Sequence, residues 1–457
     1  MSVSTFVGIE TALRGLVAQQ QALEIAGHNI TNANTPGYTR QTANFSTTAP
    51  VQVAPGSLLG TGVTVTGFQR IRDSFLDVQL RAQTMLQGSA QATQDNLGQI
   101  EGVINEPSDT GLNSLLGAYW SAWQNVANSP QDTATRQALV ESAKSLASGL
   151  NNTSTQLSTI ASQTTQDAGL TLQQVNSDAQ TLQSLNTAIY NAKAVGDTPN
   201  DLLDQRDKLL DDMSQLGNVS VTDNSDGTNN VSFDGVALVA GKTAYTLSES
   251  GGTLSNSMAV PQTATLTSTM GKLGALVTLR DTTIPSYQSQ LDAIANALST
   301  QTNTLNAAGY ALDGTTGNNF FSGTTAATIA VVATPTKVAA SATAAGVPGD
   351  NTNALALADL QNQSLASLSG TTIDAAYAQL VTTIGSDSQS AQRAVSNANV
   401  LVDSLTNRRD SVSGVSLDEE MTNLVKYQQG YQAASRALNS IDDALNILIN
   451  RTGRVGL

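Results

Sequence analysis

The chain has 457 residues with no cysteine, and His28 is its single histidine. These counts exclude a disulfide framework, a thiolate metal site and any metal motif that needs two histidines. Charged residues make up 12% and aromatic residues 4% of the chain, a composition that favours long polar helices over a dense aromatic core. The sequence contains no run of eighteen apolar residues, so we expect no membrane span.

The net charge of −15 is unevenly distributed. Residues 1–81 and 401–457 together carry eleven basic and eleven acidic side chains, whereas residues 82–400 carry ten basic and twenty-five acidic ones. The neutral ends are suited to packing closely with copies of themselves. The acidic middle is suited to exposure to water and repels phosphates, so we expect no nucleic-acid partner.

Residues 9–30 carry a seam in alternating steps of four and three, which is the period of a coiled-coil helix. The seam positions are Ile9, Leu13, Leu16, Gln20, Leu23, Gly27 and Ile30. Such a helix buries its stripe against a partner, and we expect the partner to be the helix at the other end of the chain.

Residues 29–41 read Asn-Ile-Thr-Asn-Ala-Asn-Thr-Pro-Gly-Tyr-Thr-Arg-Gln. Asparagine ends a helix readily, and Pro36-Gly37 then forces a turn. An amphipathic helix that leads into this turn resembles the N-terminal signature of bacterial flagellar axial proteins, the family of rod, hook and hook-junction subunits.

Residues 60–84 predict a strand around Val63 and Val65 and a helix that starts near Asp73. Gly60-x-Gly62 lacks the third glycine of a dinucleotide-binding loop, so we expect no such cofactor. This block is more similar to the hook-junction members of the family than to the hook protein.

Long helices are predicted between residues 85 and 216. Trp120 and Trp123 lie three apart on one helix face and are expected in a core. A helix from about 131 to 195 would be roughly 100 Å long, and a shorter acidic helix is expected at 200–216.

The chain then alternates between β and helical character. Residues 218–268 predict strands, with a hairpin turn at 223–227. This turn is not a calcium loop, because Thr222 and Phe233 would occupy positions that need carboxylates. Helices are expected at 272–308, with a kink or restart at Pro285, and from Ile373 to about Arg409.

The last predicted helix begins with Ser416 as its N-cap and Glu419 three residues later, which is a capping box. Adjacent Glu419 and Glu420 point about 100° apart on a helix, so they are not a convergent catalytic pair. The apolar seam of this helix comprises Leu417, Met421, Leu424, Tyr427, Tyr431, Ala434, Leu438, Ile441, Leu445 and Leu448. Its sequence is similar to the C-terminal signature of the same flagellar family.

We predict a mainly α fold with β-rich insertions, a discontinuous multidomain axial protein with paired terminal helices and a long helical-bundle middle. The predicted domains are 1–60 with 413–457 as a terminal coiled coil, 61–317 with 371–412 as the bundle with a β segment at about 218–268, and 318–370 as a small β-rich or irregular outer insertion.

The resemblance implies a structural subunit and not an enzyme, secreted unfolded through the flagellar type III channel without a cleavable signal. It implies a ring between hook and filament, with the paired terminal helices innermost. The implied partners are copies of the chain itself, the hook protein, a second hook–filament junction protein and a helical export chaperone on the C-terminal helix. A hook or rod protein is the main alternative, and an exported cell-wall enzyme is a weaker one.

The predicted assembly interface combines apolar seam residues with residues of the turn. Its members are Ile9, Leu13, Leu16, Leu23, Asn29, Ile30, Asn32, Asn34, Gly37, Tyr38, Leu417, Met421, Leu424, Tyr427, Tyr431, Leu438, Ile441, Leu445 and Leu448.

Overall fold

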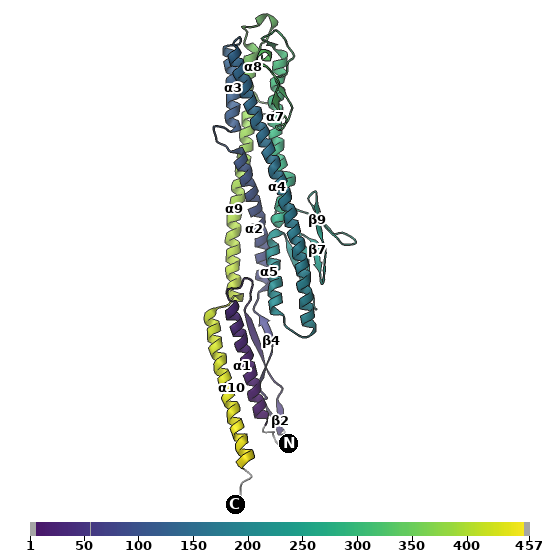
Figure 1. The fold of residues 1–457 in the computed structure, drawn as a ribbon, viewed down its shortest axis with the longest axis vertical. Coiled ribbons are helices and arrows are strands. Elements are labelled where there is room, and N and C mark those ends of the chain that lie inside the picture. Colours follow the sequence, from purple (N-terminus) through teal and green to yellow (C-terminus); the bar gives the residue numbers. More distant parts are fainter. Residues whose placement is uncertain (1–5, 55, 452–457) are drawn as a thin grey trace, which may run out of the picture.

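The computed structural model describes residues 6–54 and 56–451, except for the side chains of residues 53, 54 and 448–451. The chain forms a long rod with both termini at one end (Figure 1). The helices of the rod are α2 (Ser74–Ile104), α3 (Leu112–Asn128), α4 (Thr133–Ala194), α5 (Asn200–Leu216), α6 (Gly271–Thr278), α7 (Ile284–Ala308), α8 (Thr352–Asp359) and α9 (Ile373–Ser413). The predicted mainly α fold with β-rich insertions is confirmed. None of the described helices combines the length and hydropathy that a membrane crossing needs.

Helix α4 forms the spine of the rod and matches the helix predicted at 131–195. It contains 62 residues, which at about 1.5 Å per residue extends over roughly 90 Å. The Asp132 side chain caps its first turn by accepting a hydrogen bond from the amide of Ala134, at 2.9 Å. Its buried stripe includes Leu139, Leu146 and Leu157, at spacings of seven and eleven residues, so one face of the helix lies in the core.

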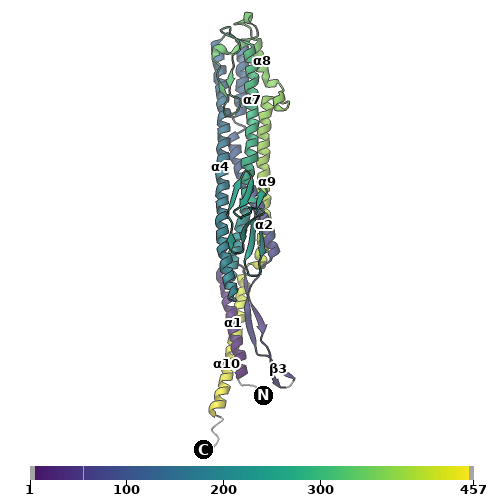
Figure 2. The same ribbon diagram turned by 90° about the vertical axis from the view of Figure 1, so that its right-hand side faces the viewer.

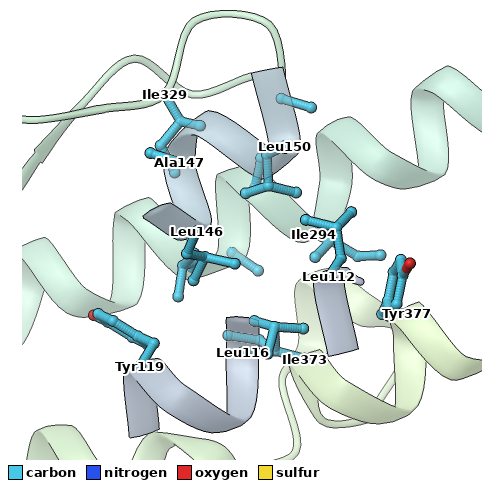
Figure 3. Packing of buried hydrophobic residues seen from close by; sticks show 14 of the residues in the cluster. Leu112, Leu116, Tyr119, Leu146, Ala147, Leu150, Ile294, Ile329, Ile373 and Tyr377 are labelled. Atoms are coloured by element: carbon cyan, nitrogen blue, oxygen red, sulfur yellow. The ribbon is translucent and has the colours of Figure 1, made fainter. Parts of the chain in front are cut away.

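The distal half of the bundle is closed by aromatic side chains. Tyr119 and Trp123 of α3 pack against Phe320 and Phe321, with ring centroids 5.4–6.4 Å apart. Figure 3 shows neighbouring members of the same core: Leu112, Leu116, Tyr119, Leu146, Ala147, Leu150, Ile294, Ile329, Ile373 and Tyr377. Residues of the predicted outer insertion at 318–370 therefore share the core of the bundle and form its distal end. The boundaries of the domains stay a prediction.

This distal end contains short strands between α7 and α9. They are β12 (Tyr310–Ala311), β13 (Phe321–Ser322), β14 (Ala330–Val331) and β15 (Ala339–Ser341). Arg136 of α4 is 1% exposed and donates hydrogen bonds to the carbonyls of Pro130, at 2.7 Å, and Val338, at 2.6 Å. A buried guanidinium thus ties these strands to the spine.

Two antiparallel sheets project from one side of the rod and face the viewer in Figure 2. One has the order β5-β6-β7-β8 and the other β11-β10-β9. Their strands are β5 (Val219–Asp223), β6 (Asn229–Phe233), β7 (Val236–Ala240), β8 (Thr243–Ala244), β9 (Leu247–Ser250), β10 (Thr253–Asn256) and β11 (Thr263–Thr265). Val219 pairs with Phe233, which confirms the predicted hairpin.

A π-helical segment, η1 (Leu279–Thr283), joins α6 to α7 just before Pro285, where the sequence predicts a kink. Arg280 in this segment holds the β9–β10 hairpin against the rod. Its guanidinium donates two hydrogen bonds to Glu249, both at 2.9 Å, and two to Asp281, at 2.6 and 2.8 Å. These bonds lower the pKa of both carboxyl groups, so the clamp stays ionised near neutral pH.

The termini form a separate narrow unit at the lower end of the rod (Figure 1), which we call the terminal ribbon. It consists of α1 (Phe6–Asn32), α10 (Leu417–Arg451) and the strands β1 (Gln41–Thr47), β2 (Val51–Ala54), β3 (Ser57–Leu59) and β4 (Val63–Arg70). Helices α1 and α10 run antiparallel, because Asn29 lies near Glu420 and Gly8 near Ile441. The predicted pairing of the two terminal helices is confirmed.

Asp234 is a buried acid at the turn between β6 and β7. Its side chain is 1% exposed, and its Oδ1 accepts a hydrogen bond from the amide of Asn218 at 2.7 Å. Its Oδ2 is buried without a hydrogen-bond partner among the described residues. Burial disfavours the charged form and raises the pKa of this carboxyl to about 7.

Asp234→Asn is expected to remove a pH dependence of stability. An acid with a raised pKa in the folded state contributes stability that is complete below its unfolded pKa of about 3.9 and is lost as the pH rises through about 7. Relative to the variant, the unaltered chain should lose on the order of a few kcal/mol between these values. Urea denaturation across this range tests the expectation, and parallel pH profiles for the two chains would contradict it. Asparagine keeps the acceptor and tolerates the positive φ of 49°.

Candidate functional site: the terminal ribbon and its joint

Helix α1 packs through its smallest residues. Ala18, Ala22 and Ala26 are each 1% exposed. The glycines of the pair mark close approach: Gly15 faces Ala434, and a Cβ on Gly430 would lie 2.8 Å from the side chain of Gln19. Because these side chains are small, the helix backbones lie close together with little apolar volume between them.

The predicted seam of α1 is therefore not its packed face. Leu13 is 48% exposed and Gln20 is exposed, while Ile9, Leu16, Leu23 and Ile30 are half-buried. Our expectation that this seam packs on the other terminal helix is wrong at Leu13 and Gln20, and at the half-buried positions it stays a prediction. A search for hydrophobic periodicity scores leucine and isoleucine higher than alanine, so it selects the face with the large side chains. The face with the alanines nevertheless allows closer contact between helices.

The seam of α10 is placed better by the sequence. Leu424, Tyr427, Tyr431, Leu438, Ile441 and Leu445 are half-buried on the face toward α1 and β1. The ring of Tyr427 lies 6.2 Å from that of Phe45 in β1. Leu417 and Met421, however, are 50% and 54% exposed, and the side chain of Leu448 lies outside the described part of the structure.

Large apolar side chains remain exposed along the whole ribbon. The exposed set comprises Phe6, Leu13, Val17, Phe45, Val51, Leu58, Leu59, Leu417, Met421, Val425 and Ile447. Among the described residues of α10, Glu420 alone is buried. Extended apolar surface of this kind marks a site of association.

Asn29 of the turn motif lies at the centre of the joint between ribbon and bundle, and it is 1% exposed. Its Nδ2 donates to the Gln41 carbonyl at 2.8 Å and to Glu420 at 3.1 Å. Its Oδ1 accepts from the Gln41 amide at 3.0 Å and from the Tyr38 hydroxyl at 2.7 Å. One side chain thus fixes the end of α1, the following strand and the start of α10.

Arg40 connects the same strand to α10 through charge. It donates to Glu420 at 2.8 Å and to Glu419 at 2.6 Å. Its amide donates to the carbonyl of Ser413, at the end of α9, at 2.9 Å. Glu419, which the sequence assigns to the capping box, and its neighbour Glu420 therefore both bind an arginine. The Ser416 hydroxyl accepts a hydrogen bond from the Glu419 amide at 3.4 Å.

Helix α5 supplies the bundle side of the joint. Asp201 accepts from Gln41 at 3.0 Å, and Asp204 accepts from the Thr39 amide at 3.0 Å. Burial raises the pKa of the Tyr38 hydroxyl, and the charges of Asp201, Asp204 and Glu420 raise it further. Tyr38 therefore stays protonated and available as a hydrogen-bond donor to Asn29.

Four aspartates, at positions 201, 204, 207 and 211, recur at helical spacing on α5. Asp204 and Asp207 each accept a hydrogen bond from Arg70 at 2.8 Å. Asp211 binds both Arg81 of α2, at 2.7 Å, and Arg409 of α9, at 2.8 Å. Sequence reasoning missed this ladder, although the spacing of the aspartates and the arginines of residues 70–81 were the signals.

The other motif residues have smaller roles. The Asn32 side chain donates to the carbonyl of His28 at 3.0 Å, which ends α1 locally. Gly37 has a φ of +82°, and a Cβ there would lie 3.0 Å from the Lys208 side chain of α5, so glycine is required. Asn34 is exposed on the loop. In the described ranges 6–54 and 56–451, no cluster of three or more histidine and acidic side chains could hold a metal ion.

These features define a class of protein: a rod-shaped structural subunit whose paired termini expose apolar surface for association. Comparisons with known proteins agree. The flagellar hook-associated protein FlgK helical domain family matches residues 97–321, the flagella basal body rod protein family matches 9–39, and the flagellar basal body rod FlgEFG protein C-terminal family matches 409–451.

Flagellar hook-associated protein 1 of Bacillus subtilis (strain 168) is 31% identical, over 98% of this chain and 99% of the relative. The protein of the same name from Escherichia coli (strain K12) is 27% identical, over 97% and 99%. The structure of the flagellar hook junction protein FlgK from Burkholderia pseudomallei has the same fold, with a TM-score of 0.66 and 19% identity over 74% of this chain and 100% of that chain.

The chain belongs to the flagellar hook-associated protein 1 family. It is a structural component of the bacterial flagellum and not an enzyme, and it associates with other flagellar proteins. The alternatives of a hook or rod protein share the matches to the two ends of the chain, but the match to the helical domain separates this chain from them.

Asn29→Leu is expected to loosen the ribbon from the bundle. Leucine has a similar size but leaves the Gln41 backbone, Tyr38 and Glu420 without partners, which costs on the order of 3 kcal/mol. Hydrogen exchange should accelerate in α1 and in the first turns of α10 while α4 keeps its protection. Asn34→Leu is the matched control, because Asn34 is exposed on the neighbouring loop. Equal exchange in the two variants would contradict a central role for Asn29.

Proposed function

We propose that this chain forms the junction ring between hook and filament, and that it assembles through the terminal ribbon. The apolar surface that the ribbon leaves exposed is the observation that carries this proposal. A ring of ribbons would cover Leu13, Val17, Met421 and their neighbours with the same surfaces of adjacent copies. The ring would lie outside the cell and be required for filament growth.

Two separate seams follow from the geometry of the ribbon. The intrachain seam brings Gly8 and Gly15 of α1 close to Ile441 and Ala434 of α10, beside half-buried residues such as Leu438. The intersubunit seam comprises the exposed residues Leu13, Val17, Leu417, Met421 and Val425. Of the assembly residues predicted from the sequence, Leu13, Leu417 and Met421 belong to this second seam, and the deeply buried Asn29 belongs to the joint.

The charge distribution supports one orientation of the subunit in the ring. The ribbon sequence is close to neutral, whereas residues 82–400 carry the full charge excess of −15. Neutral surfaces pack against copies of themselves at low electrostatic cost, and acidic surfaces favour exposure. The ribbons therefore form the inner wall around the channel and the bundles face outward.

The proposed position of the ring, between the hook and the filament, determines which proteins it contacts. One axial face contacts the hook protein, and the opposite face contacts the second hook–filament junction protein. The chain reaches this place unfolded through the flagellar type III channel. It has no cysteine, so no disulfide restricts passage through a narrow channel.

A small helical export chaperone is proposed to cover α10 before export. The segment 413–457 carries five acidic and four basic residues, so its attraction to a partner is mainly apolar. Its stripe of Leu424, Tyr427, Tyr431 and Leu438 is half-buried even with α1 in place. A groove that accepts this stripe would prevent premature association in the cytoplasm.

Met421→Asp is expected to block incorporation into the junction and leave the isolated chain folded. The side chain is 54% exposed in the chain alone, so a carboxylate there is solvated until a neighbouring copy covers it, at a cost of several kcal/mol. Leu438→Asp should also block incorporation, but by separating α10 from α1. Electron microscopy of hooks and filaments tests assembly, and hydrogen exchange of α10 separates the two causes. Normal filaments with Met421→Asp would contradict the assignment of the intersubunit seam.

Truncation after Val412 is expected to abolish binding of the chaperone. Calorimetry of chaperone binding to the truncated and full chains tests whether the binding site lies after Val412. Repeating the full-chain titration at high salt tests whether the contact is mainly apolar or mainly electrostatic. Affinity should change little with salt, because apolar contacts are not screened. Undiminished binding by the truncated chain would place the site elsewhere, and a steep loss of affinity with salt would show that charge dominates.

A further inference from the structure

The loop between β10 and β11, residues 257–261, carries an exposed apolar tip that we call the knob. Its sequence is Ser-Met-Ala-Val-Pro. Val260 is 81% exposed and Met258 is half-buried, while Ala259 and Pro261 are exposed. The knob stands on the sheets that project from the side of the rod (Figure 2).

The base of the knob is firmly built. Asn256 is 4% exposed. Its side-chain Nδ2 donates a hydrogen bond to the carbonyl of Ala237, and its Oδ1 accepts one from the backbone amide of Gln262, both at 2.9 Å. The Gln262 side chain accepts from the amide of Ala237 at 2.8 Å. Ser257 exchanges two bonds with the backbone of Thr246, at 2.9 and 3.0 Å. An apolar tip that is fixed in one conformation loses little entropy when it is covered by a partner.

A groove of about 550 Å³ lies between α2 and α9. Its α9 side is formed by Ala391, Ala394, Ala398 and Leu401, in steps of three, four and three, and its α2 side by Leu86, Ala90 and Leu97. Leu86 is 38% and Leu401 49% exposed. Ser268 and Thr269, which follow β11, and Leu279 and Thr283 of η1 complete the lining of the groove. Both α2 and α9 thus present alanine and leucine side chains to this space.

Both surfaces avoid the charge that covers the rest of the bundle. Residues 253–271 contain no charged side chain. Asp387 is the acid at the groove, and its Oδ2 accepts a hydrogen bond from the Tyr287 hydroxyl at 2.6 Å. Two acidic bundles repel each other at most points of contact, so uncharged patches are the places where they can meet.

We infer that, in the ring proposed above, the knob of one copy seats in the α2–α9 groove of its neighbour. A closed ring is built from a head-to-tail contact, which requires two different complementary surfaces on different sides of the subunit. Figure 1 shows the sheets projecting from one side of the rod and α9 on the other. The contact gives the bundles a lateral interface of their own, outside that of the ribbons.

Cysteine cross-linking tests this contact against a background without native cysteine. Two variants, Val260→Cys and Ala394→Cys, each place a thiol at an exposed position. They are co-expressed, and purified hook–filament junctions are treated with a short bis-maleimide. We expect cross-linked dimers when the two variants are mixed and none with either alone. The double variant should give a ladder of oligomers in junctions and no cross-link between chains in dilute monomer.

Val195→Cys mixed with Ala394→Cys is the matched control, because Val195 is 77% exposed and lies outside the knob. Junctions that support filaments but cross-link no more through Val260 than through Val195 would overturn the inference while the proposed function stands. If the variant chains are absent from junctions that support filaments, the proposed function itself fails. A cross-link within one chain of the dilute double variant would also overturn the inference, because the knob would then reach its own groove.

Discussion

Two helices alone cannot bury all of the apolar surface that they carry, and this constraint organises the whole chain. In the terminal ribbon, Ala18, Ala22 and Ala26 of α1 are buried, whereas Leu13 and Val17 remain exposed. A ribbon of this kind gains further stability when a partner covers the exposed apolar side chains. The bundle has no such need, because it encloses two hydrophobic cores, one around Tyr119, Trp123 and Phe320 and the other around Leu210 and Phe233.

The joint connects the ribbon, which leaves apolar side chains exposed, to the bundle, which buries them in a core. The residues that cross it are mainly hydrogen-bonding or charged: Asn29, Arg40, Gln41, Asp204 and Glu420. Polar contacts of this type fix direction strongly and contribute modest net free energy, because each group also binds water when the joint opens. Assembly of the ribbon can therefore set the orientation of the rod without either unit depending on the other for its core.

Sequence periodicity predicted the elements that have one strong apolar stripe, such as α4 and α10 beyond Leu424. It misjudged α1, since hydrophobicity counts the leucines and overlooks the close approach that alanine and glycine permit. It recognised the motif of Asn29, Gly37 and Tyr38 by resemblance. Thr39 and Gln41, which follow these residues, bind Asp204 and Asp201 of α5, more than 150 residues away in sequence. Nothing local to the motif specifies which acids it will meet, so its contact with the aspartates of α5 became visible only in three dimensions.

The acidic character of the middle has a structural consequence beyond solubility. Acids on α5 are neutralised by Arg70, Arg81 and Arg409, so the charge that remains lies on the outer surfaces of the bundle. Copies placed side by side would repel through these surfaces, and the repulsion falls off within about 8 Å at physiological ionic strength. Close lateral approach is therefore confined to uncharged places. The neutral ribbon satisfies this condition at one end, and the segment around Val260 satisfies it on the rod.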